Sequence, residues 1–175
     1  MFFKPKSLEI IFKDQRRKTK FSIPDKIPLL QRVQTIKILG VTFTSSLPVT
    51  LHVQSVIAAC AQTLYALRVL RMHGLCDDSL HDVFRAVAVA KLMYASNAWW
   101  GFSNANDRQK IFAFIRRCVR TGFCSPDLAD FHDLYISSDE KLFNKILTCP
   151  NHILRTLLPP RYHPLHKITV LEIDV

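Results

Sequence analysis

Glycine is scarce in this chain, which has four glycines among its 175 residues. A loop that cradles phosphate groups uses glycine at several positions, so this scarcity argues against a nucleotide-binding phosphate loop. The chain also lacks a Gly-x-Ser-x-Gly motif and a Cys/His signature of nucleophilic enzymes. The sequence therefore gives little support to nucleophilic catalysis.

Long apolar runs and secretory features are missing as well. The uncharged stretch at residues 47–66 contains His52 and other polar residues, so it indicates an amphipathic helix rather than the roughly 20 apolar residues of a membrane span. The start of the chain has no apolar segment long enough for a signal peptide. Five cysteines, an odd number, fit a reducing compartment. We therefore expect an intracellular protein, in the nucleus or the cytoplasm, with no membrane partner.

The charge is strongly unbalanced, because 24 lysines and arginines face 14 acidic residues and give a net charge of +10. Such an excess attracts polyanions, either nucleic acid or an acidic membrane surface, and charge alone does not choose between them. Hydrophobic residues make up 49% of the chain. This content is enough for a buried core and unlike that of a disordered chain.

Strand patterns occupy the first part of the chain. Short strings rich in β-formers at Leu8–Phe12 and Phe21–Ile23, and an alternating string at Ile36–Phe43, each predict a strand. Gly40 interrupts the third string, which indicates a bulge or a close approach of another group to the backbone.

Near Pro48 the hydrophobic period changes from 2 to 3.6. Apolar residues from Val49 to Leu70 predict a long helix that ends at Gly74. A second helix is expected to open at Ser79, with Asp82 completing an imperfect capping box, and to continue to about residue 94.

Three more helices are predicted further along. One begins between Asn104 and Asp107, one is short and covers 128–135, and one opens at a Ser137/Glu140 capping box and runs to about residue 148. The tail from residue 158 is rich in proline and predicts an extended segment. Antiparallel strands followed by a mainly α-helical bundle belong to the α+β class.

The most tempting chemical pair is Asp77-Asp78, because polymerases hold two metal ions between carboxylates. Here the pair precedes a predicted helix, and acidic residues at a helix N-terminus interact favourably with the helix dipole. The helix-start interpretation is favoured, and we assign no catalytic residue.

Histidines and cysteines near the C-terminus have a spacing that suits zinc, with Cys149-x2-His152 followed by His163-x2-His166. Pro150 lies inside the first pair and further prolines surround the second. The favoured alternative is a tail with scattered histidines, so we assign no metal site.

Basic clusters are the most informative polar feature, since each lysine or arginine that meets a phosphate releases a counterion and makes binding salt-dependent. The alternative is a solvated face, and cations near a helix C-terminus are stabilising in any case. Trp99 and Trp100 could stack on bases, with core packing as the favoured role. The candidate cations are Arg16, Arg17, Lys18, Arg68, Arg71, Lys110, Arg116, Arg117 and Arg120.

A set of short strings follows one order along the chain, and the central one is Lys37-Ile38-Leu39-Gly40-Val41. It resembles the Lys-x-Leu-Gly-Val strand near the end of the reverse transcriptase of LINE-type (non-LTR, jockey-like) retrotransposons. The supporting strings are Lys6–Phe12, Leu51-His52-Val53, Leu67–Leu75, Met93–Gly101, Ile115–Arg120, and Asn151–Leu154 with Leu157–Pro160. Residues 168–175 depart from the family pattern.

The resemblance implies a domain organisation. Residues 1–46 would be the end of the palm, 47–125 the helical thumb, and 126–175 the C-terminal helices and tail. The strand with Lys37 and Gly40 would belong to the primer grip, and the thumb would follow the RNA/DNA template–primer duplex.

The order of the strings bears on catalysis as well. In the family, the Asp-Asp turn that binds magnesium precedes the first of these strings, so Asp77-Asp78 would not be that turn. The chain would depend on a missing N-terminal part for catalysis, would hold no cofactor of its own, and would be inactive alone. The alternatives are a small basic α-helical module that binds nucleic acid or protein, and an inert product of transposon decay.

Overall fold

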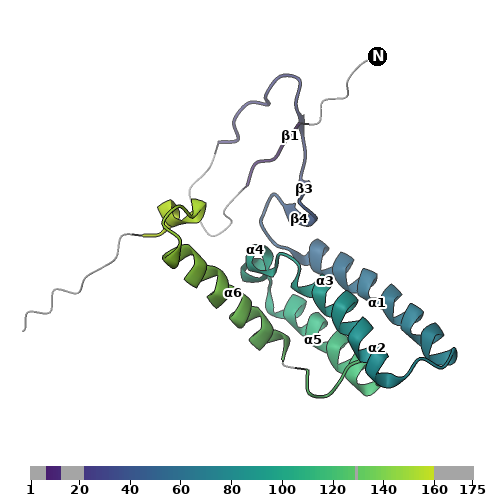
Figure 1. Ribbon diagram of the computed structural model, residues 1–175. Coiled ribbons are helices and arrows are strands. Elements are labelled where there is room, and N and C mark those ends of the chain that lie inside the picture. Colours follow the sequence, from purple (N-terminus) through teal and green to yellow (C-terminus); the bar gives the residue numbers. More distant parts are fainter. Residues whose placement is uncertain (1–6, 13–21, 129, 160–175) are drawn as a thin grey trace, which may run out of the picture. The chain divides into compact units, whose positions relative to one another are not determined.

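The structure of this chain is a computed structural model that describes residues 7–12, 22–128 and 130–159 (Figure 1). It divides into two compact units, the N-terminal unit Met1–Ser138 and the C-terminal unit Asp139–Val175. The basic turn at 16–18, the beginning of the strand predicted at 21–23, and the tail beyond residue 159 lie outside the described residues.

The first ladder is short and parallel, so the prediction of antiparallel strands is wrong for this pair. Strand β1 (Leu8–Glu9) pairs with β2 (Gln31–Arg32), so only two residues of the string predicted at 8–12 are in a strand. Arg32 donates to both carboxylate oxygens of Glu9 at 2.9 Å, and this pairing lowers the pKa of Glu9. Residues 22–23 are not in a strand.

The second ladder is an antiparallel hairpin of β3 (Thr35–Ile38) and β4 (Val41–Thr44). The prediction of one strand over 36–43 is wrong, because Leu39 and Gly40 have φ of +45° and +87° and reverse the chain in a two-residue turn. The close approach predicted at Gly40 is confirmed, since a Cβ there would lie 3.3 Å from a ring carbon of Tyr94.

Helix α1 (Thr50–Met72) follows, as its periodicity predicts. Just past its last residue lies Gly74, whose φ is +88°, and the N–H of Leu75 donates to the carbonyl of Leu70 at 3.1 Å. This arrangement is the glycine-terminated helix end expected from the sequence.

Helix α2 (Asp77–Phe84) begins two residues before the predicted start, with Cys76 as N-cap and no side-chain cap bond. The capping box expected from Ser79 and Asp82 is therefore wrong, while the helix-start interpretation of Asp77-Asp78 is confirmed. The helix continues through a π-helical turn, η1 (Arg85–Val89), into α3 (Ala90–Met93).

A short break separates α3 from two single-turn elements, α4 (Ser96–Trp99) and η2 (Trp100–Phe102). Ala95, with φ of +50°, lies at this break. Helix α5 (Ala105–Arg120) then begins at Asn104, whose side chain accepts a hydrogen bond from the N–H of Asp107 at 2.8 Å, so its predicted start is confirmed.

Helix α6 (Phe131–Thr148) is continuous, and its last residue is the predicted one. The separate helix start predicted at Ser137 and Glu140 is wrong, because both residues lie inside α6, where Ser137 has no helix end to cap. The boundary between the two units falls within this helix. The short η3 (Ile153–Leu157) lies in the C-terminal unit.

The core of the N-terminal unit gathers around α1, α5 and the two tryptophans. Trp99 and Trp100 are 1% and 2% exposed, so the core interpretation of both is confirmed. Phe131 and Tyr135 of α6 pack on Trp100 with ring centroids at 5.2 Å. Helices with short strands on the N-terminal side confirm the predicted α+β class.

Helix α1 is long and apolar enough to cross a membrane, judged by length and composition alone. The same test is passed by core helices of soluble proteins, and one face of α1, with Val53, Cys60, Leu64 and Leu67, is buried in the core. The expectation that no membrane is involved stays a prediction.

Candidate nucleic-acid interface

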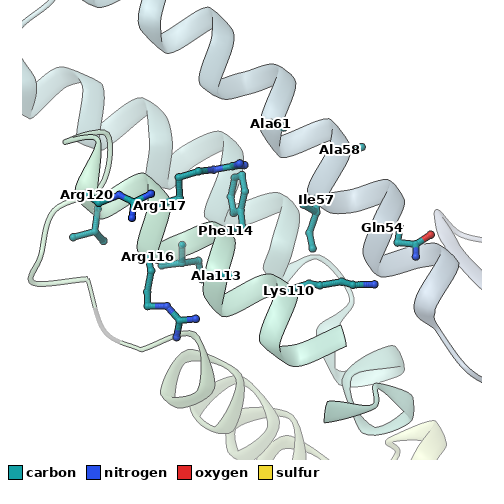
Figure 2. Close-up of a pocket in the computed structure, with 12 residues that line it drawn as sticks. Gln54, Ile57, Ala58, Ala61, Lys110, Ala113, Phe114, Arg116, Arg117 and Arg120 are labelled. Carbon is teal, nitrogen blue, oxygen red and sulfur yellow. The ribbon is translucent and has the colours of Figure 1, made fainter. Parts of the chain in front are cut away.

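The candidate interface is a groove between α1 and α5, with a volume of about 1110 Å³ (Figure 2). The hydroxyl of Thr50, at the start of α1, donates to the carboxylate of Asp107 in the first turn of α5 at 2.8 Å. At the other end, Arg71 of α1 reaches the backbone that follows α5. The two helices therefore run side by side in the same direction.

The floor of the groove is apolar. Ile57 and Ala61 contribute from α1, and Ala113 and Phe114 from α5. Phe114 is also part of the core, together with Ile111 and Cys118 on the same face of α5. Burial of that face orients α5, and the same orientation places the basic positions of the helix along the groove.

Four cations of α5 line the groove: Lys110, Arg116, Arg117 and Arg120. No acidic residue lines it, and none of the four forms an ion pair with a carboxylate in the described part of the chain. In Figure 2, Lys110 and Arg117 extend toward α1, while Arg116 points away from it. All four therefore line one groove, and Lys110 and Arg117 are the two that reach toward its α1 side.

The α1 side of the groove carries no comparable charge. Between Thr50 and Leu67 the helix has no lysine, arginine, aspartate or glutamate. Gln54, Ala58 and Ala61 are the exposed α1 residues that line the groove. Sequence reasoning missed this side, although the uncharged stretch of α1 was the signal that could have revealed it.

Arg71 has a different environment from the α5 cations. Its guanidinium donates to the carbonyls of Thr121 at 2.9 Å and Gly122 at 2.6 Å, lies 4.1 Å from the ring centroid of Phe123, and is 3.5 Å from the carboxylate of Asp77. These contacts hold two of its nitrogens against the backbone after α5, while the buried Nε has no hydrogen-bond partner. The nucleic-acid contact of Arg71 stays a prediction. Arg68 is exposed near the end of α1 and lies outside the groove lining.

The hairpin residues of the predicted primer grip also lie outside the groove lining. Lys37 is exposed on β3, and Gly40 lies in the turn against Tyr94, whose hydroxyl donates to the carbonyl of Leu39 at 3.1 Å. The predicted contacts of Arg16, Arg17 and Lys18 lie outside the described residues.

Buried His52 connects the hairpin to the core. Its Nδ1 lies 3.5 Å from the N–H of Thr42, and its ring packs edge-on to Trp99 with centroids at 5.2 Å. Burial and the nearby charge of Lys37 lower the pKa of His52. A neutral imidazole in this position fits a packing role.

The chemistry of the buried cysteines is consistent with the lack of a nucleophile motif. Burial raises the pKa of the Cys118 thiol to about 12 and that of Cys60 to about 11. Thiolates, rather than thiols, are nucleophilic, so these two side chains pack as small apolar groups.

The part of the chain that the structure describes contains no group of three or more histidine, cysteine or acidic residues that could hold a metal ion. Asp77 and Asp78 are exposed in the first turn of α2. His163 and His166 lie outside the described ranges, so the expected absence of a metal stays a prediction.

No model of a known protein family, no curated protein and no solved structure matches the chain. The likeness to LINE-type reverse transcriptases therefore stays a prediction that depends on the sequence strings alone.

Proposed function

We propose that this chain is the C-terminal part of a LINE-type reverse transcriptase, which holds template–primer nucleic acid and does not extend the primer by itself. The observation that carries the proposal is the row of four α5 cations along one groove, where none of the residues that the structure describes contributes an acidic group to the lining. If the four cations only kept the helix face in contact with water, there would be no reason for them to lie together beside an apolar groove.

The spacing of the row suits a phosphate backbone. Lys110 and Arg117 are seven residues apart, which places them on nearly the same side of the helix and about 10 Å apart along its axis. Arg120 extends the row to about 15 Å. The phosphates of one strand of B-form DNA follow one another about every 3.4 Å along the helix axis, so this length spans about four of them, within reach of long, flexible side chains.

Salt dependence of binding tests the proposal. If the four cations each neutralise one phosphate, the logarithm of the binding constant should fall with the logarithm of salt concentration with a slope of about −3. A variant with Arg116→Ala, Arg117→Ala and Arg120→Ala should flatten the slope by about 2, measured by filter binding with DNA and RNA oligomers.

A matched control removes the same charge elsewhere. Lys91, Lys141 and Lys145 are exposed and do not line the groove, so replacing all three with alanine should lower the slope less than the arginine variant does. Equal slopes for the two triple variants would show that net charge alone attracts nucleic acid, and the proposed groove would then be wrong.

A further inference from the structure

The two sides of the groove differ in charge. Lys110, Arg117 and Arg120 line the α5 side, whereas α1 has no charged side chain from Thr50 to Leu67. A duplex exposes two phosphate backbones and fits best between two basic walls. A single strand exposes phosphates along one edge and bases along the other, so one basic wall and one uncharged wall match a single strand.

The apolar floor of the groove also favours a single strand over a duplex. Ile57 and Phe114 make it apolar, and the alanines at 58 and 61 add small apolar side chains on the α1 side. Sugars and the flat faces of unpaired bases bury apolar area against such a surface. In a duplex the base faces are stacked inside the helix and are not available for this contact.

An exposed aromatic ring continues the uncharged wall. Tyr65 follows the groove residue Ala61 by four residues, which places it on the same face of α1 one turn further along. Its side chain is 70% exposed, unlike the two buried tryptophans. Exposed aromatic rings beside a basic track are the usual stacking platforms for unpaired bases.

From these features we propose that the α1/α5 groove takes an unpaired, single-stranded segment of nucleic acid, with its phosphates on the α5 cations, its bases toward α1, and one base stacked on Tyr65. This inference rests on the proposed function and narrows it to the unpaired part of the template–primer.

The test compares the full chain and its variants on a single-stranded oligomer of about 12 nucleotides, within the range of known single-strand sites, and on the matching blunt duplex. The wild-type chain should bind the single strand several-fold more tightly. Tyr65→Ala should weaken single-strand binding about five-fold or more, Tyr65→Phe should keep it, and neither should change duplex binding. A 2-aminopurine base scanned along the oligomer should show, at one position, a fluorescence change that Tyr65→Ala removes.

Controls keep failure of this inference separate from failure of the proposed function. Phe102→Ala, at another exposed aromatic residue, should leave binding unchanged. If the duplex binds as tightly and Tyr65→Ala has no effect, while the arginine variant still flattens the salt slope, the single-strand assignment is wrong and the nucleic-acid function stands. If the arginine variant also has no effect, both are wrong.

A separate test uses neutral lipid vesicles. If the chain binds them, Tyr65→Ala weakens that binding and no 2-aminopurine signal is seen, this face of α1 is assigned to a membrane and the inference is overturned.

Discussion

Arg71 is expected to hold the N-terminal unit together rather than to bind nucleic acid. Its guanidinium connects the end of α1 to the backbone carbonyls of Thr121 and Gly122, just after α5, and stacks on Phe123. Replacing Arg71 with alanine should therefore destabilise the unit and leave the salt dependence of nucleic-acid binding unchanged.

The size of the effect follows from these contacts. A hydrogen bond from a charged donor contributes about 1.5 to 3 kcal/mol, and stacking of a cation on a ring adds on the order of 1 kcal/mol. The exposed Asp77 adds about 0 to 1 kcal/mol. Because the Arg71 side chain is 36% exposed, water can replace part of these bonds. We expect a net loss of about 2 to 4 kcal/mol for Arg71→Ala. Arg71→Lys should recover part of this loss, since an ammonium can still donate but lacks the planar fork.

Urea unfolding followed by tryptophan fluorescence measures this loss. Both tryptophans of the chain are buried in the N-terminal unit, so their emission reports that unit. Arg68→Ala, on the same helix and with an exposed side chain, is the matched control and should cost less than about 0.5 kcal/mol. An Arg71→Ala variant no less stable than Arg68→Ala, or one with a flattened salt slope, would refute this account of Arg71.

Three further predictions concern the hairpin and its contact with the core. Since the pKa of His52 is lowered in the folded state, the unfolded chain binds more protons below the ordinary histidine value of about 6.5, and stability should fall as the pH drops through that region. Urea midpoints at about pH 7.5 and 5.5 should show this fall in the wild type and less of it in His52→Asn; an equal fall in both would count against the histidine as its source. In the turn, Gly40→Ala should cost about 1 to 2 kcal/mol because φ is +87° and the added Cβ would meet Tyr94 at 3.3 Å. Leu39→Asn should stabilise by a few tenths of a kcal/mol, because asparagine tolerates the positive φ better. The midpoint temperature of thermal unfolding should therefore fall for Gly40→Ala and rise for Leu39→Asn. A destabilising Leu39→Asn would contradict the turn geometry.

Local chemistry predicted the helices well. The periodicity from Val49 to Leu70, the end of α1 at Gly74 and the start of α5 at Asn104 all depend on residues within a few positions of each other, and each is confirmed. The predictions failed where a local signal was weak or misleading. The capping pattern at Ser137 lies inside a continuous helix. A residue that can cap a helix end does not by itself make the helix begin at that position.

The hairpin shows a second kind of failure. Alternation over 36–43 fits one strand as well as two, and Leu39-Gly40 is an uncommon turn pair because leucine is strained at positive φ. The contact between Leu39 and Tyr94 spans 55 residues of sequence. Pattern along the chain carries no information about such a contact.

By itself the sequence determined the fold class, the helix faces and the excess of positive charge, because each depends on composition or on spacing within one element. Only the tertiary structure decided which cations line the groove and which bind other groups of the same fold. Arg71 and Arg117 look alike in the sequence, and Arg71 differs because the carbonyls that bind it lie about 50 residues away. The groove also depends on the tertiary structure, since its two walls come from helices whose first turns, at Thr50 and Asp107, are 57 residues apart in the sequence.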